Sequence, residues 1–581
     1  MSRLKMDEII FGRSLREPGY RVDFAIGSTY SLDLETFISL PFSLGFMEEP
    51  DEVMKQSPTY IFAALRLCSS RLAVFCNFSD IKVPPKNYKV YCALMEESVF
   101  PVNVSRKDRI VNFHPKVWVV RQTSLEKEES ILRVIVMSRN LTRDGSLDCA
   151  CVLTGKIGNR RASKEAQARH KPLGDFLKFL SQYASDFKKE QMTGLAGDVL
   201  RIERFDVDGP FDDYAFLPMG IRGYSGENCL EDLRRSVRVV VVSPFLDDAT
   251  LKQFDAKREE ALLVTQELSI DQTAVDVFGK ENIYTMSPGM TDNDLEESVD
   301  LHAKMYFSTR WDGSWKNYVY IGSTNATRNG FTSNVEFLMM LRFKRRMISW
   351  YEFADYFRND SEHRFMQMVD IVEGGGSKVE EYQQSLSLRH AIASITQGDV
   401  VEENDAYTIR LTVSGRDPET EVYPLLRPDL KAVLEPGLSF PGLALVELSE
   451  FYVVMTAGLS RVVKIPTNKI PGERNEEICR RYFITSPDQF MDCISFLLSE
   501  SKTAYVLSRM SFFMRSQEGV AKLATSSYPA VYEDLLREAY DSPDTFGDIK
   551  TFLESLPLDV VPQEFDELYK MIIRAIDGFR G

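Results

Sequence analysis

Short apolar runs, separated by polar and helix-like stretches, dominate the first two thirds of the chain. Runs of this length that are rich in β-branched residues predict β-strands, whereas the stretch 59–70 is typical of a helix. The first series of predicted strands is 72–77, 90–95, 116–122 and 131–137. The second series is 237–242, 261–265, 282–286, 304–309, 318–322 and 335–342. This alternation predicts two α/β lobes, each with a mixed sheet.

Changes in this pattern divide the chain into five parts. Residues 161–205 are charged and helix-like and are predicted to connect a first lobe (1–160) to a second lobe (206–372). A Gly-Gly-Gly-Ser run at 374–377 predicts a linker. Beyond it we expect a small β-rich domain at 378–485 and a helical domain at 486–581. The strands expected there are 407–414, 432–434, 444–448, 452–456 and 461–465, and the last helix is 562–579.

Composition limits the class of protein. The chain has 581 residues and a net charge of −16, whereas proteins that coat duplex nucleic acid without specificity are usually basic. The eight cysteines form no CxxC pair, which predicts buried free thiols. No signal peptide and no apolar run of about 18 residues is evident, so we expect a cytoplasmic protein without a membrane partner.

One motif occurs twice. Each copy is H-x-K followed by S-x-N-x-T-R-[DN]-G, and the His and Asn are 26 residues apart in the first copy and 23 in the second. The chain contains five histidines, and two of them occupy equivalent positions of this repeat. The repeated positions are His114 and His302, Lys116 and Lys304, Ser138 and Ser323, Asn140 and Asn325, and Arg143 and Arg328.

The repeated residue types predict phosphoryl chemistry. Side chains two apart on a strand share a face, so the His and Lys of each copy would project together. Two such units facing each other would supply two ammonium groups and two amides, a clamp for a phosphoryl group that needs no metal or cofactor. One imidazole would attack phosphorus, and the other would protonate the leaving oxygen and later activate water. A carboxylate would fix the tautomer of each ring, and Glu336 and Asp148 are the candidates.

Other residues of the motif are expected to contact substrate. For Arg143 and Arg328, contact with flanking phosphates and a structural ion pair are equally good interpretations. Ser138 and Ser323 are expected to bind the substrate beside them.

The paired motifs resemble those of the phospholipase D superfamily, over roughly residues 60–345. Most lipid-directed members carry an Asp seven residues after the His, where this chain has Arg121 and Thr309. In this respect, and in the strand that leads to Asn140, the chain is similar to the tyrosyl-DNA phosphodiesterase branch and to metal-independent nucleases. The resemblance implies that His114 is the nucleophile and His302 the general acid, although the residues themselves leave the order open.

These observations predict a metal-independent phosphodiesterase or nuclease acting on nucleic acid, most simply DNA. By analogy it would be a component of bacterial restriction or antiphage defence. The acidic charge favours a partner such as a helicase, another translocase or another defence-complex protein, and one chain suffices for one site, so both a monomer and a homodimer are compatible. The alternatives are a phospholipid phosphodiesterase and a non-catalytic subunit that binds phosphate or nucleic acid.

Overall fold

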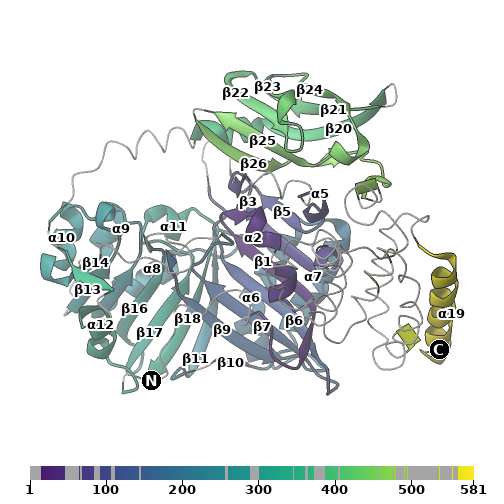
Figure 1. The fold of residues 1–581 in the computed structure, drawn as a ribbon. Helices are drawn as coiled ribbons and strands as arrows, with labels where there is room; N and C mark the ends of the chain where they lie inside the picture. Colours follow the sequence, from purple (N-terminus) through teal and green to yellow (C-terminus); the bar gives the residue numbers. More distant parts are fainter. Residues whose placement is uncertain are drawn as a thin grey trace, which may run out of the picture.

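The computed structural model describes residues 15–38, 40–45, 65, 68–83, 92–105, 111–142, 146–207, 209–254, 260–287, 300–344, 346–359, 364–368, 370–371, 386–403, 406–456, 458–475, 477–478, 490, 494, 535–536, 553 and 561–580. The fold is a mixed α/β arrangement in which two large sheets lie side by side, as the strand pattern predicts (Figure 1).

The first lobe is built on a seven-stranded sheet with the order β10-β9-β7-β6-β1-β3-β5. Its strands are β1 (Tyr20–Thr29), β3 (Leu72–Asn77), β5 (Val99–Val102), β6 (Val117–Ser124), β7 (Ser130–Met137), β9 (Ala150–Lys156) and β10 (Phe205–Val207). The strand β1, which the sequence analysis did not predict, lies between β3 and β6. Because β10 pairs with β9, the first sheet includes residues assigned above to the second lobe.

The second lobe is built on an eight-stranded sheet with the order β11-β18-β17-β16-β12-β13-β14-β19. Its strands are β11 (Asp213–Met219), β12 (Arg238–Val242), β13 (Glu260–Val264), β14 (Ile283–Met286), β16 (Met305–Trp311), β17 (Trp315–Gly322), β18 (Glu336–Lys344) and β19 (Phe365–Gln367). In both lobes two antiparallel strands follow the H-x-K segment, β6 and β7 in one and β16 and β17 in the other. The repeat in sequence is therefore a repeat in topology.

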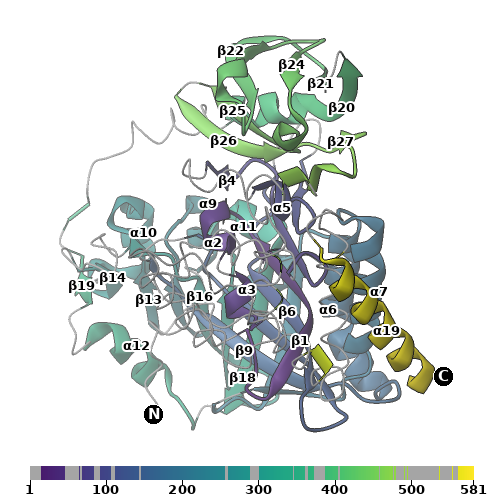
Figure 2. The ribbon, with the colours of Figure 1, turned by 45° about the vertical axis from the view of Figure 1, so that its right-hand side comes forward.

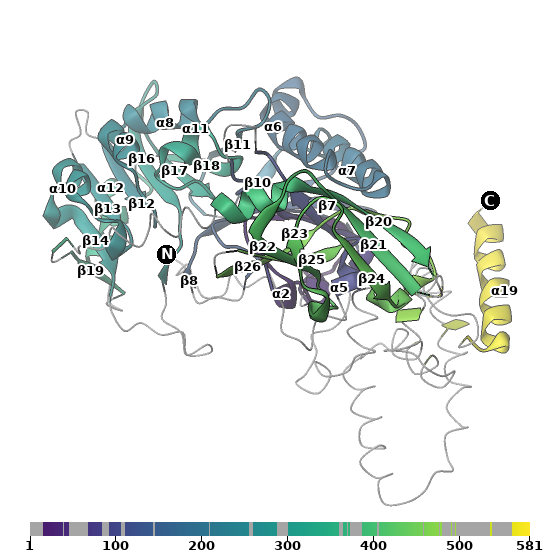
Figure 3. The same cartoon turned by 90° about the horizontal axis from the view of Figure 1, so that it is seen from above.

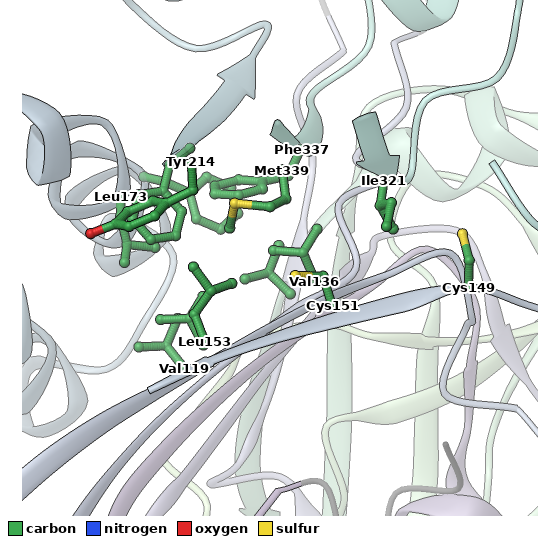
Figure 4. Packing of buried hydrophobic residues seen from close by; sticks show 14 of the residues in the cluster. Val119, Val136, Cys149, Cys151, Leu153, Leu173, Tyr214, Ile321, Phe337 and Met339 are labelled. Carbon is green, nitrogen blue, oxygen red and sulfur yellow. The ribbon is translucent and has the colours of Figure 1, made fainter. Parts of the chain in front are cut away.

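A shared hydrophobic core joins the lobes. It contains Val136 of β7, Leu153 of β9, Ile321 of β17 and Phe337 of β18, all buried in one cluster (Figure 4). The connecting segment forms two helices, α6 (Lys164–Ser181) and α7 (Asp186–Val199), as predicted. The helix α6 adds its Leu173 to the same cluster. Burial of this apolar surface is the main force that holds the two sheets together.

The β-rich domain is continuous with the first lobe. Its six-stranded sheet, of order β2-β4-β26-β25-β22-β23, takes β2 (Leu32–Asp33) and β4 (Ile81–Lys82) from the first lobe. The remaining strands are β22 (Asp417–Pro424), β23 (Ala432–Leu434), β25 (Phe451–Thr456) and β26 (Leu459–Lys464). A second sheet, of order β24-β21-β20-β27, contains β20 (Ile395–Glu403), β21 (Ala406–Val413), β24 (Ser439–Leu443) and β27 (Thr467–Asn468). Figures 2 and 3 show this green domain over the first lobe.

A buried carboxylate strengthens that junction. Glu96 of the first lobe accepts hydrogen bonds from Ser449 Oγ at 2.7 Å, from the backbone nitrogen of Glu450 at 2.8 Å and from Arg474 Nη1 at 2.8 Å. Such a charge is tolerated inside a protein because it is paired and hydrogen-bonded. The β-rich domain is thus fixed to the lobe that carries His114 and Lys116.

Two predicted strands are wrong. Residues 92–95, within the predicted strand 90–95, form the short helix α5 (Cys92–Met95), in which all four side chains are buried. Within the predicted strand 444–448, Leu445–Glu447 form a 3-10 turn, which the Glu447 carboxylate caps by accepting from the Ala444 nitrogen at 2.8 Å. Both runs are apolar but short, and burial alone does not distinguish a strand from a helical turn.

Little of the predicted helical domain falls within the described residues. Its last helix is confirmed as α19 (Gln563–Arg580), and Phe565, Tyr569 and Ile572 of that helix are buried. Within the part of the chain that the structure describes, no helix combines the length and the apolar character needed to cross a bilayer.

Candidate active site

The segment around the first histidine pairs with a strand end of the other lobe. The backbone nitrogen of His114 donates to the carbonyl of Val335 at 2.9 Å, and Phe113 forms a β-bridge with Val335. This pairing places His114 Nδ1 2.9 Å from Glu336 Oε2, at the start of β18 in the other lobe. The carboxylate therefore lies where it holds a proton on Nδ1 and leaves Nε2 free.

The second histidine repeats the arrangement in the opposite direction. The backbone nitrogen of His302 donates to the carbonyl of Leu147 at 3.0 Å, and His302 Nδ1 lies 2.9 Å from Asp148 Oδ1. Short strands support the contact, because β15 (Asp300–Leu301) pairs with β8 (Ser146–Leu147) across the lobes. Each lobe thus provides the histidine of one pair and the carboxylate of the other.

Neither H-x-K motif lies within a strand. His114 and Lys116 precede β6, and His302 and Lys304 precede β16, in extended backbone that pairs with the other lobe. The prediction of a strand position was wrong by a few residues. The expected consequence, that His and Lys of one motif lie together, still holds, because each Lys Nζ donates to the carbonyl of the His two residues before it.

The two lysines are buried, and the positive charge of Lys304 acts on Lys116. Lys116 Nζ lies 3.0 Å from the His114 carbonyl oxygen, and Lys304 Nζ lies 2.6 Å from that of His302. Burial, followed by the charge of Lys304, holds the pKa of Lys116 well below its usual range. Glu336 and Asp148 oppose this shift only in part. An anion that enters between the lysines would relieve their repulsion, so the site is built to accept one.

Both histidines favour the neutral form in the unliganded protein. Burial lowers the pKa of His114 to about 4, against the opposing effect of Glu336. Burial and Lys304 also lower the pKa of His302, while Asp148 opposes the shift. For Asp148, desolvation acts to raise the pKa, but the hydrogen bond and charge of His302 outweigh it and the pKa is lowered. Near neutral pH both imidazoles are therefore neutral, and an anionic ligand would favour protonation of one ring.

The structure corrects the role expected for the two motif serines. Ser138 and Ser323 are fully buried, and the hydroxyl of each is already engaged by a carboxylate rather than left for substrate. Ser138 Oγ donates to Asp148 Oδ1 at 2.6 Å, and Ser323 Oγ donates to Glu336 Oε2. The serines therefore hold the carboxylates that contact the histidines. The backbone nitrogen after each carboxylate, of Cys149 or Phe337, donates in turn to the serine Oγ.

The two motif asparagines follow β7 and β17 at the same end of the sheets. Asn140 Oδ1 accepts from the Ser31 nitrogen at 3.4 Å, and Asn325 Oδ1 is buried without a partner among the described residues. Two further residues of the second motif, Thr327 and Gly330, stabilise the local backbone conformation. Thr327 caps the helix α11 (Arg328–Thr332) by accepting from the Gly330 nitrogen. A Cβ at Gly330 would lie 2.7 Å from the Asn325 carbonyl oxygen, which explains the glycine.

The arginines near the motifs have different environments. Arg143 lies outside the described residues, and Arg328 is exposed at the first position of α11. Arg121 is ion-paired with Asp23 and Asp198, and Arg310 with Asp232, so these two have structural partners.

Sequence reasoning missed Tyr30 and Asn334. The ring of Tyr30, just beyond β1, lies 5.1 Å from the imidazole of His114 between centroids, and Lys116 Nζ lies 5.8 Å from the same ring. Asn334 Nδ2 donates to Glu336 Oε1 at 3.2 Å. Asn334 precedes Glu336 by two residues and could have been noticed, whereas Tyr30 carries no local signal. No group of three or more His, Cys, Asp or Glu side chains in the described segments is placed to hold a metal ion.

Comparison with known proteins gives distant structural likeness only. No protein-family model and no curated protein matches the chain. A mutant of yeast tyrosyl-DNA phosphodiesterase 1 aligns at 10% identity and a TM-score of 0.34, over 57% of this chain and 84% of that one. Phosphatidylserine synthase of Haemophilus influenzae aligns at 9% identity and a TM-score of 0.34, over 64% of this chain and 89% of that one. Polyphosphate kinase of Porphyromonas gingivalis aligns at 10% identity and a TM-score of 0.34, over 66% of this chain and 50% of that one. Scores this low carry no argument about this chain.

Proposed function

We propose that this chain is a metal-independent phosphodiesterase that cleaves nucleic acid, most simply DNA, through a phosphohistidine. The observation that carries the proposal is the crossed arrangement in which His114 meets Glu336 and His302 meets Asp148, with a buried lysine beside each histidine. A purely structural repeat has no use for two tautomer-fixed imidazoles and two lysines held at low dielectric.

The first step forms a bond between nitrogen and phosphorus. The lone pair of His114 Nε2 attacks phosphorus, because Glu336 holds the proton on Nδ1. The bond from phosphorus to the leaving oxygen breaks, and that oxygen takes a proton from Nε2 of protonated His302. Lys116, Lys304, Asn140 and Asn325 stabilise the charge on the remaining oxygens of phosphorus.

The second step returns the protein to its starting state. His302, now neutral, removes a proton from water, and the water oxygen attacks phosphorus. The bond between phosphorus and nitrogen breaks, and its electron pair returns to Nε2 of His114. Asp148 stabilises the charge that His302 carries when protonated. The assignment of His114 as nucleophile follows the resemblance of the motifs, since the geometry of the two pairs is symmetric.

A single experiment tests the proposal. Labelled single- and double-stranded DNA is incubated with the protein in excess EDTA, beside the His114→Ala variant. Cleavage by the wild type alone supports the proposal and shows which strand form is preferred. Cleavage by both proteins, or cleavage that EDTA abolishes, contradicts it. An acidic chain would engage DNA with help from a partner, so a translocase or another defence-complex protein is part of the proposal.

A further inference from the structure

An arginine from outside the two lobes reaches the His114 half of the site. Arg389 lies in the helical segment 386–394, directly before β20 of the β-rich domain. Its Nη1 donates to Asn112 Oδ1 at 2.6 Å and its Nη2 donates to Tyr30 Oη at 2.7 Å. Since the acceptors are 277 and 359 residues away along the chain, the contact depends entirely on how the domain is docked.

The first contact leads to Glu336 through the backbone of Asn112. The Asn112 nitrogen donates to Asn334 Oδ1 at 3.2 Å, and the Asn112 carbonyl accepts from the Val335 nitrogen at 2.9 Å. Asn334 Nδ2 in turn donates to Glu336 Oε1. By fixing Asn112, Arg389 fixes the cross-lobe pairing that brings Glu336 to His114.

The second contact leads to His114 through an aromatic ring. Arg389 donates to the phenol oxygen of Tyr30, and the ring of Tyr30 adjoins both His114 and Lys116. A ring held at its hydroxyl limits the rotation of the imidazole beside it. The two contacts of one guanidinium therefore both act on the surroundings of the same histidine, and the rigid fork of arginine suits such a double contact.

We infer that Arg389 is a positioning residue for His114, supplied by the C-terminal part of the chain. Through Asn112 and Tyr30 it holds the imidazole against Glu336 in the geometry required for attack. The inference rests on the proposed function for its consequence in catalysis, although the positioning itself is a property of the unliganded protein. It also gives the β-rich domain a role in the site, because docking of this domain completes the half-site of the nucleophile.

The test compares Arg389→Ala with Arg389→Lys, Tyr30→Phe and the control Arg410→Ala, which removes an arginine that pairs with Glu403 in the same domain. Histidine labelled with ¹⁵N reports the tautomer of each ring, and the signal of His302 serves as an internal reference. Steady-state cleavage gives kcat and KM separately. Thermal unfolding identifies any variant that does not fold, in which case Tyr30→Phe and Arg389→Lys carry the test.

For Arg389→Ala we expect a mixture of His114 tautomers, an unchanged His302, and a kcat lower by about 100-fold with little change in KM. Arg389→Lys and Tyr30→Phe should lie between this variant and the wild type, and Arg410→Ala should match the wild type. An unchanged His114 signal overturns the inference, as does a rise in KM at constant kcat, which would mean that Arg389 binds substrate directly. If the tautomer changes but even the wild type cleaves no substrate, the positioning role stands and the proposed function fails.

Discussion

The Nδ1 atom of His114 lies 2.9 Å from Oε2 of Glu336, although 222 residues separate the two along the chain. The equivalent pair, His302 and Asp148, spans 154 residues in the opposite direction between the lobes. Neither lobe can therefore build a complete histidine–carboxylate pair alone. The site depends on the shared core between the two sheets, and each substitution below tests one part of that arrangement.

His114→Ala and His302→Ala should each reduce kcat/KM by several orders of magnitude, because residues that act as a unit fail together. The two variants should differ in what accumulates. His114→Ala removes the covalent step, whereas His302→Ala, offered a substrate with a good leaving group, should trap a phosphoenzyme detectable by acid-labile label. His390→Ala, at an exposed histidine, is the control. Label on the protein in His114→Ala but not in His302→Ala would reverse the assigned roles.

Lys116→Met should lower kcat/KM by about 100- to 1,000-fold and leave the protein as stable as the wild type or more stable. The loss follows because one preorganised donor to the phosphoryl group disappears. The stability follows because Lys116 is a buried cation whose pKa is already depressed by burial and by Lys304, and an apolar chain of similar size avoids that desolvation. Lys178→Met, on the exposed side of α6, should change neither quantity. A large drop in the melting temperature of Lys116→Met would show that the lysine is structural.

Ser323→Ala and Ser138→Ala should lower kcat by about 10- to 100-fold at nearly constant KM. Losses of this size are seen when a residue that orients a metal-coordinating side chain is removed, and here the serine orients a carboxylate in the same way. The reason is that each hydroxyl holds a carboxylate, Glu336 or Asp148, rather than the substrate. Steady-state kinetics distinguish the two roles. A raised KM with unchanged kcat would restore the substrate-binding role that the sequence alone suggested. Ser314→Ala, at the exposed turn between β16 and β17, is the matched control.

Acid should destabilise the protein between about pH 6.5 and pH 4. His170 is fully buried against Tyr214 Oη, and burial lowers its pKa to about 4 from its ordinary 6.5, as for His114. Over this range the unfolded chain binds more protons than the folded one, so stability falls as the pH falls. His170→Gln should reduce the loss in the free energy of unfolding between pH 7 and pH 5 by about 2 kcal/mol. Urea unfolding at pH 7 and pH 5 measures the free energy of unfolding of both proteins. An equal loss of this free energy in the wild type and in His170→Gln would show that His170 does not cause the acid destabilisation.

His170 also shows where local reasoning fails. It sits in a charged helical sequence typical of a surface, yet it lies in an aromatic pocket with Phe205, Tyr214 and Phe216. Those rings come from β10 and β11, which are neighbours of α6 only after folding. A helix pattern tells which residues share a face, but not how polar residues on that face are covered.

The sequence by itself determined the two lobes, most of the strands of their sheets and the pairs His114/His302, Lys116/Lys304 and Asn140/Asn325, because periodicity and repetition are local properties of the chain. Only the tertiary structure decided that the histidine–carboxylate pairs cross between lobes, that the motif serines serve the carboxylates, and that Arg389 reaches Tyr30 and Asn112. Apart from the serine contacts, which span 10 and 13 residues, these contacts join residues far apart along the chain, with no spacing that marks them. They form because burial of the common core fixes the two sheets, and the docked β-rich domain, in one relative position.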